Sequence, residues 1–190
     1  MINYPIKRKP QVKATNYANL GMTLESDIEA SNAYYLHHQI AVIHKKPTPV
    51  QVVNVSYPAR NKAKITEAYY KTPSTTDFNG IYQGKYIDFD AKETNSKTSM
   101  PLKNVHPHQI EHLRSVYQHG GIAFLIVHFK PFNEYYLLTA DLLLEYWDAQ
   151  HEEKGRKSIP YETFQTKAFL IPFGYQPRLD YLKIVKDNFL

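Results

Sequence analysis

With 190 residues, of which 43% are apolar and 14% aromatic, the chain is long enough to bury a core and is not an intrinsically disordered protein. It has no cysteine, and its longest purely apolar run, residues 122–127, is far too short to cross a bilayer, so we expect a cytoplasmic protein without disulfides or membrane contact. The formal net charge of +5 is uneven, because residues 1–72 hold ten Lys and Arg against four acids while residues 73–190 hold thirteen against fourteen. This basic N-terminal part favours a polyanionic partner, and nucleic acid is the usual one.

The first elements along the chain are predicted to be a basic arm and a helix. Residues 1–19 carry four cations and two prolines without apolar periodicity, which predicts a flexible arm. Thr23 is well placed to cap a helix over residues 24–38. Glu25 falls in the first turn of that helix, where an acid can simply complement the helix dipole, so its role is open at this point.

Residues 45–71 are predicted to project from the body of the protein. They follow a buried strand over residues 40–44 and include an alternating strand over residues 50–57. Cations interspersed with tyrosines suit a surface that follows phosphates and stacks on exposed bases. The alternative is an ordinary exposed hairpin whose tyrosines form a minor core. The candidate DNA-binding cations of this segment are Lys45, Lys46, Arg60, Lys62, Lys64 and Lys71.

An antiparallel pair of strands is predicted within residues 75–92. Glycine-containing turns allow residues 77–82 to pair with residues 85–93, which brings Asp77 towards Asp90. Magnesium prefers one or two carboxylates together with water and phosphate oxygens. Asp77 and Asp90 therefore form a candidate Mg²⁺ site.

The second strand of this pair alternates polar and apolar residues. Its period of two sends Asp88, Asp90 and Lys92 to one face. A lysine beside a metal-binding carboxylate can neutralise charge on an attacked phosphate, so this face indicates a metal-dependent phosphodiesterase. The alternative is an ordinary strand with one wet face, and Asp88 is expected to be a solvated or merely supporting carboxylate.

The C-terminal half is predicted to be mainly scaffold. A helix from Pro107 to the glycines at 120–121 has Tyr117 in its core stripe. Four histidines within residues 106–119 lack a third ligand nearby in sequence, so a zinc site is not favoured. Further strands are predicted over residues 122–129 and 135–140, and further helices over residues 142–150 and 179–190. This order of elements predicts an α/β fold with a mixed central sheet.

Six phrases spread over nearly the whole chain form a specific pattern. They are Gly21–Glu25, Ala41–Pro49, Glu67–Tyr70, Ser74–Asp77, Tyr86–Thr94 and His106–His112. Together they resemble the RecU family of bacterial Holliday junction resolvases. The resemblance implies a restriction-endonuclease-like α/β fold, with a mixed central β-sheet flanked by helices and a protruding stalk, in a single nuclease domain over residues 1–190. It also implies a homodimer that nicks opposed strands of a four-way DNA junction with Mg²⁺, and the sequence leaves open whether Mn²⁺ substitutes. The further partners that the family suggests are the bacterial recombinase and branch-migration machinery.

The resemblance also assigns roles to individual residues. The metal-site residues that it implies are Thr75, Asp77, Asp90 and Gln109. It makes Lys92 the stabiliser of the transition state, Glu25 the acid supplied by the first helix, and Tyr70 an aromatic of the stalk that wedges into the junction centre. Asp90 stands where a glutamate is usual, and Leu20 stands where an arginine is usual. We expect cleavage to survive these departures, with weaker junction binding or weaker modulation of the recombinase.

Two other functions are compatible with the sequence. A nuclease of the same fold could prefer duplex or flap DNA, and competition between substrates separates it from a resolvase. A junction-binding or strand-annealing protein could keep the DNA-binding surface and lack the chemistry. Ablation of Asp90 separates this last reading, because only an intrinsic nuclease loses cleavage while it keeps binding.

Overall fold

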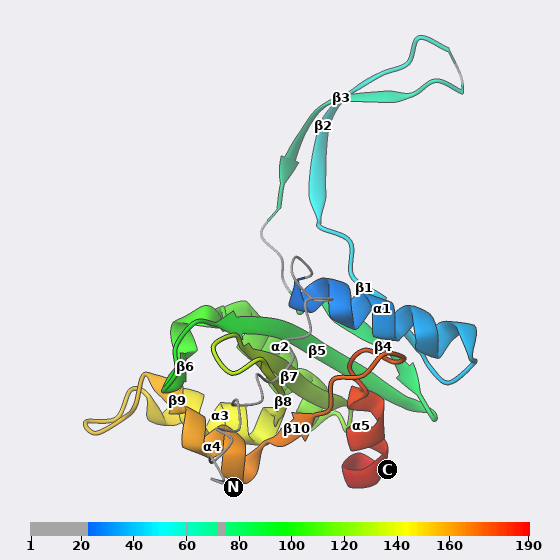
Figure 1. Cartoon of the computed structure of the whole chain (residues 1–190). Helices are drawn as coiled ribbons and strands as arrows, with labels where there is room; N and C mark the ends of the chain where they lie inside the picture. The colour runs from blue at the N-terminus through cyan, green and yellow to red at the C-terminus, as the bar shows by residue number, and fades with distance from the viewer. Residues whose placement is uncertain (1–22, 60, 72–74) are drawn as a thin grey trace, which may run out of the picture.

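The computed structural model describes residues 23–59, 61–71 and 75–190 (Figure 1). The basic arm expected over residues 1–19, together with Leu20 and Arg60, therefore lies outside the described residues. The described chain forms a body built on a six-stranded sheet and a long two-stranded hairpin that rises from this body. None of the described helices is long and apolar enough to span a membrane.

The central sheet is mixed and has the strand order β1-β4-β5-β7-β8-β10. Neighbouring strands are antiparallel except β5 and β7, which run parallel because the chain crosses over between them through a helix. The strand pair expected within residues 75–92 is confirmed, with Phe78 opposite Phe89 and Ile81 opposite Tyr86. The strands of the sheet are β1 (Val42–Lys45), β4 (Phe78–Tyr82), β5 (Lys85–Thr94), β7 (Ile122–Phe129), β8 (Glu134–Thr139) and β10 (Phe169–Ile171).

Helices cover both faces of this sheet, and each face has its own apolar core. The helices are α1 (Leu24–His37), α2 (Pro107–Gln118), α3 (Ala140–Ala149), α4 (Tyr161–Lys167) and α5 (Tyr181–Phe189). One core lies under α1 and α5 and contains the stacked rings of Phe78, Phe89 and Phe124, with centroid separations of 5.0 and 4.8 Å. The other core lies under α2, α3 and α4 and contains Leu125 and Val127. Strand β7 supplies both cores, which explains its nearly continuous apolar sequence.

Several short elements on the α2 side do not follow from the sequence pattern. A 3-10 helix, η2 (Leu102–Asn104), and a small sheet of β6 (Ser99–Pro101) and β9 (Ser158–Pro160) complete the second core. The expectation that Tyr117 lies in the core stripe of α2 is wrong, because its side chain is 49% exposed. The fully buried residues of α2 come from its first two turns, and in its last turn Val116 packs against the core while Tyr117 faces outward.

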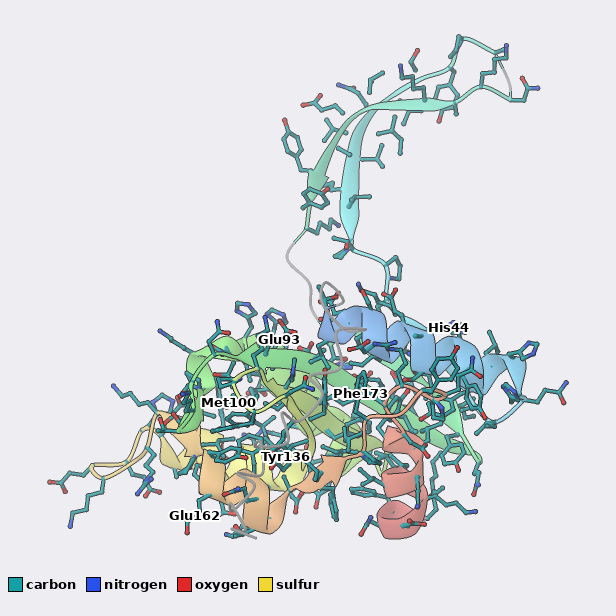
Figure 2. The ribbon with its side chains drawn as sticks, in the orientation of Figure 1. His44, Glu93, Met100, Tyr136, Glu162 and Phe173 are labelled. Atoms are coloured by element: carbon teal, nitrogen blue, oxygen red, sulfur yellow. The ribbon has the colours of Figure 1, made fainter. Side chains whose placement is uncertain are left out.

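The projecting segment is a two-stranded antiparallel hairpin, called the stalk below. It consists of β2 (Val50–Ser56) and β3 (Lys64–Tyr70), and its side chains point into open space on both faces (Figure 2). Tyr57, Tyr69 and Tyr70 are 70%, 60% and 83% exposed, so they form no minor core. The expected fold class, a mixed central sheet flanked by helices with a protruding stalk, is confirmed, although the stalk begins at β2 and not at residue 45.

Candidate active site

Asp77 and Asp90 lie opposite each other on neighbouring strands. Asp77 directly precedes β4, and the pairing of Phe78 with Phe89 places Asp77 beside Asp90 at the next position of the ladder. The backbone N–H of Lys46 donates to the Asp77 carbonyl at 2.7 Å, which extends the β1–β4 pairing by one step. The structure therefore brings the two acids together as the turn pattern predicts.

The Asp90 carboxyl is fully buried, and only one of its two oxygens accepts a hydrogen bond within the described chain. Its Oδ1 accepts a hydrogen bond from the Ala91 N–H at 2.8 Å, and its Oδ2 lies 3.0 Å from Lys92 Nζ. The lysine contact is an ion pair, since Oδ2 accepts no hydrogen bond within the described chain. Burial raises the pKa of Asp90 to about 7, Lys92 opposes this rise, and the neighbouring Asp77 carboxyl reinforces it.

The polar face of β5 is buried inside the protein. Asp88, Asp90 and Lys92 share this face, as the alternation predicts, and α2 covers it through a contact between His112 and Asp88. Asp88 and Asp90 are both 0% exposed, and the Lys92 side chain is 13% exposed. The reading of a wet strand face is therefore wrong, because α2 packs over the strand. Of the two alternatives for Asp88, the solvated one is wrong as well, and the supporting one is consistent with its burial.

The other two candidate ligands reach this region from different elements. Gln109 stands in the first turn of α2, is 5% exposed, and accepts a hydrogen bond through Oε1 from the His106 N–H at 3.1 Å. Thr75 comes from the segment that returns from the stalk, and its Oγ1 donates to the Thr76 carbonyl at 3.3 Å. Both side-chain oxygens keep lone pairs beyond these bonds, so each remains able to bind a cation.

A pocket of about 300 Å³ opens beside Asp77 at the root of the stalk. Glu25 and Thr75 line it together with Asp77 and Lys45. Glu25 forms an ion pair with Lys45 at 2.6 Å, and Glu29 approaches the same ammonium at 3.2 Å. The bond to Glu25 raises the pKa of Lys45. The acid from the first helix thus lies at the pocket with its carboxylate held by a lysine.

The donors that the four candidate residues offer to a metal ion are all oxygens. Among the described residues, no group of three or more His, Cys, Asp or Glu side chains converges on one point. A metal ion held by Asp77 and Asp90 would therefore need further ligands, and Thr75 and Gln109 offer neutral oxygens. Such a set suits a hard cation, Mg²⁺ or Mn²⁺, better than zinc. The buried Asp90 Oδ2, which accepts no hydrogen bond, also fits a cation; Asp90 and Gln109 are not among the residues that line the pocket.

The expected DNA-binding residues separate into two groups. Those exposed on or beside the stalk are Lys62, Lys64, Tyr70 and Lys71. Lys45 and Lys46 belong to the body instead. Lys45 pairs with Glu25, while Lys46 Nζ bonds Thr76 Oγ1 at 3.0 Å and Asp88 Oδ2 at 2.9 Å. The charges of these two lysines are thus compensated by acids of the body.

Three residues near this site are given no role in it by the sequence. Tyr86, Thr76 and His112 all donate hydrogen bonds to the Asp88 carboxylate. His112 lies one helical turn after Gln109, so helical periodicity could have placed it on the same face. Tyr86 and Thr76 carry no such signal, because hydroxyl groups of this kind are common in strands and loops.

Comparison with known proteins gives a consistent set of similarities. The model of the RecU family, described as Recombination protein U, matches residues 19–187. The chain is 58% identical over 175 residues to the Holliday junction resolvase RecU of Geobacillus kaustophilus (strain HTA426), which covers 92% of this chain and 86% of that protein. It is 56% identical over 169 residues to the protein of the same name from Staphylococcus aureus (strain MRSA252), covering 89% and 81%. It is 52% identical over 178 residues to the Holliday junction resolvase RecU of Bacillus cereus (strain B4264), which covers 94% of this chain and 88% of that protein.

Among solved structures, the Holliday junction resolvase Hjc of Archaeoglobus fulgidus matches with a TM-score of 0.40 and 9% identity. The match covers 71% of this chain and 86% of that one. This likeness is too weak to carry an argument.

Proposed function

The chain belongs to the RecU family, and on that premise we propose that it is a Holliday junction resolvase, a DNA endonuclease that cuts four-way DNA junctions. The relatives of that name are 52–58% identical to it, and it spans 81–88% of their length. We further propose that it cuts by nicking two opposed strands symmetrically and that the hydrolysis depends on a divalent cation.

The observation that carries the proposal is the pairing of Asp77 with Asp90 beside Lys92. Burial is the main cause of the raised pKa of Asp90, and the neighbouring Asp77 carboxyl adds to it, so a proton or a cation is needed to stabilise the pair. Lys92 Nζ, 3.0 Å from Asp90 Oδ2, brings one positive charge to the same place. This arrangement suits a cation bound by the acids and a phosphate bound beside the lysine.

We assign Thr75, Asp77, Asp90 and Gln109 to a Mg²⁺ site that also accepts Mn²⁺. Their oxygens match the preference of these hard cations. When bound, the ion would activate water and neutralise charge on the attacked phosphate. Asp90 is one methylene shorter than the glutamate usual in the family, and its Oδ2, which accepts no hydrogen bond within the described chain, supports its assignment as a ligand.

Two further residues are assigned roles next to the metal ligands. Lys92 stabilises negative charge on the phosphate, and its small exposure supports this role because a charge acts more strongly when it is shielded from water. Glu25 acts at the edge of the pocket, where Lys45 fixes its carboxylate.

The stalk is assigned to junction recognition. Tyr70 is 83% exposed there, and an exposed aromatic ring can stack on bases that the open centre of a junction leaves unpaired. The exposed lysines of the stalk are assigned to phosphate contacts. We also propose a homodimer, because two symmetric nicks require two active sites related by a two-fold axis.

Cleavage of a labelled four-way junction, compared with a linear duplex of the same sequence, tests this function. We expect nicks in the junction with Mg²⁺ or Mn²⁺ and none in the presence of EDTA. Binding without cleavage in either ion would contradict the proposal and favour a junction-binding protein. Equal cutting of duplex or flap DNA would favour a nuclease of different selectivity.

A further inference from the structure

One buried carboxylate, that of Asp88, collects four hydrogen bonds beneath the stalk. Asp88 is 0% exposed. Its Oδ2 accepts from Tyr86 Oη at 2.7 Å, from Lys46 Nζ at 2.9 Å and from His112 Nε2 at 2.9 Å, and its Oδ1 accepts from Thr76 Oγ1. A carboxylate only accepts, so the proton of His112 lies on Nε2. These five side chains are called the Asp88 clamp below.

The clamp joins both segments that connect the stalk to the sheet. Lys46 directly follows β1 on the outgoing segment, and Thr76 stands on the returning segment just before β4. Lys46 Nζ also bonds Thr76 Oγ1 at 3.0 Å, so Lys46, Thr76 and Asp88 contact one another in a closed triangle. The backbone bond from Lys46 to the Asp77 carbonyl ties the same two segments. The root of the stalk is therefore held on one interior carboxylate.

The clamp also borders every proposed metal ligand. These ligands are Thr75, Asp77, Asp90 and Gln109. Thr76 lies between the first two in sequence, Asp88 precedes the third by two residues on the same strand face, and His112 follows the fourth by one helical turn. Three of the five clamp residues therefore stand next to proposed ligands in the chain.

We propose that Asp88 is a positioning residue that couples the stalk to the active site. The inference rests on the proposed function and deepens it. With the clamp closed, the returning segment holds Thr75 and Asp77 in register with Asp90, so a junction seated on the stalk meets an assembled site. With the clamp open, the two segments at the root separate, and cleavage is lost although the DNA-binding surface of the stalk is unchanged.

The substitution Asp88→Asn tests this inference with almost no change of volume. The amide puts an NH₂ donor where donors already converge, so at least one partner loses its acceptor, and the partly buried charge of Lys46 loses its counter-ion. A matched control is Asp27→Asn. Asp27 is 3% exposed and pairs with Arg178 Nε at 2.6 Å, but it lies in α1, on the other side of the sheet.

The experiment compares wild type, Asp88→Asn and Asp27→Asn in four measurements. These are the single-turnover cleavage rate at saturating junction, the junction Kd, the amide hydrogen exchange of residues 44–49 and 75–78, and the rise of Tm on adding Mg²⁺. For Asp88→Asn we expect a rate about 100-fold lower, as for a small misplacement of reacting groups. We also expect a Kd near that of wild type, faster exchange at Lys46 and a smaller rise of Tm. Asp27→Asn should lower the Tm alone.

The inference would be overturned if Asp88→Asn cut the junction and exchanged its amides at the wild-type rates. It would also be overturned if Asp88→Asn lost no more cleavage rate than Asp27→Asn. If Asp88→Asn fails to fold, Thr76→Val removes one hydroxyl, which donates to Asp88 and accepts from Lys46. Thr76→Ser should restore the protection and cleavage that Thr76→Val loses. A wild-type protein that cuts no junction would contradict the proposed function instead. The amide exchange would still decide whether the clamp holds the root.

Discussion

Lys92 Nζ lies 3.0 Å from Asp90 Oδ2, an oxygen that is buried and accepts no hydrogen bond within the described chain. The two residues share one face of β5, so the strand itself fixes their separation. In the absence of substrate, the ammonium of Lys92 balances the negative charge of the Asp90 carboxylate. We expect a phosphate to bind next to the same ammonium. Changes to this pair should therefore alter chemistry and metal binding more than the fold.

Replacement of Lys92 by Met removes the charge and keeps an apolar stem of similar length. We expect the cleavage rate at saturating junction to fall by about 100- to 1000-fold, as when one charge-stabilising group is removed from an active site, with junction binding retained. Lys103→Met, at an exposed cation in η2, is the matched control and should cut normally. Wild-type rates in Lys92→Met would rule out its assigned role.

Asp90→Asn should change the Tm little in EDTA, because two effects oppose each other. The amide removes the cost of ionising a buried carboxyl, whose pKa burial raises, but Lys92 loses its counter-ion. Added Mg²⁺ should raise the Tm of wild type, because a ligand of the native state stabilises it, and should leave the Tm of the variant unchanged. Thermal unfolding followed by circular dichroism measures both effects. Equal shifts in both proteins would place the ion elsewhere.

Part of the site follows directly from the sequence. The alternation of β5 predicts that Asp88, Asp90 and Lys92 share a face, and the turn pattern predicts that Asp77 approaches Asp90. The burial of this face does not follow, because it depends on α2, which packs over β5 from a distant part of the chain. The contact between Lys46 and Asp88 joins residues 42 positions apart. The basic segment therefore predicts that Lys46 binds DNA, and only the fold shows that Lys46 contacts Asp88 instead.

The same reasoning applies to the fold. Cations, prolines and tyrosines predict a projecting segment, and the structure confirms it. The sequence does not predict the second strand of the stalk, β3. Neither face of this strand is buried, so its apolar residues do not alternate in the way that marks a strand. The short elements β6, β9 and η2 escape for a different reason. Each of them is only three residues long and gains its stability from the core that it completes.

Lys64 and Lys46 should contribute differently to DNA binding. Lys64 is exposed on the stalk, so Lys64→Gln is expected to reduce the slope of log Kd against log salt by about one unit. Lys46→Gln should leave the slope unchanged and slow cleavage, since its ammonium is bound by Asp88 and Thr76. Fluorescence anisotropy at several salt concentrations measures the slopes. A reduced slope in Lys46→Gln would mean that this lysine leaves the clamp to contact DNA.

Tyr70→Ala should impair the junction reaction more than binding to linear duplex. Stacking of one aromatic ring on a base contributes about 1–3 kcal/mol, so a loss of at least about fivefold in junction affinity or cutting is expected. Tyr175→Ala, at an 89% exposed tyrosine of the body, is the control and should change neither substrate. Equal losses on junction and duplex would indicate a general aromatic contact and not one at the junction centre.

The most direct test of the central claim is cleavage of a four-way junction labelled on each strand in turn, by wild type and by Asp90→Asn purified identically, with junction binding measured in parallel. The site assigned here predicts paired symmetric nicks by wild type in Mg²⁺, and full binding without nicks by the variant. Nicks by Asp90→Asn at the wild-type rate would show that hydrolysis takes place at a site other than the pair formed by Asp77 and Asp90.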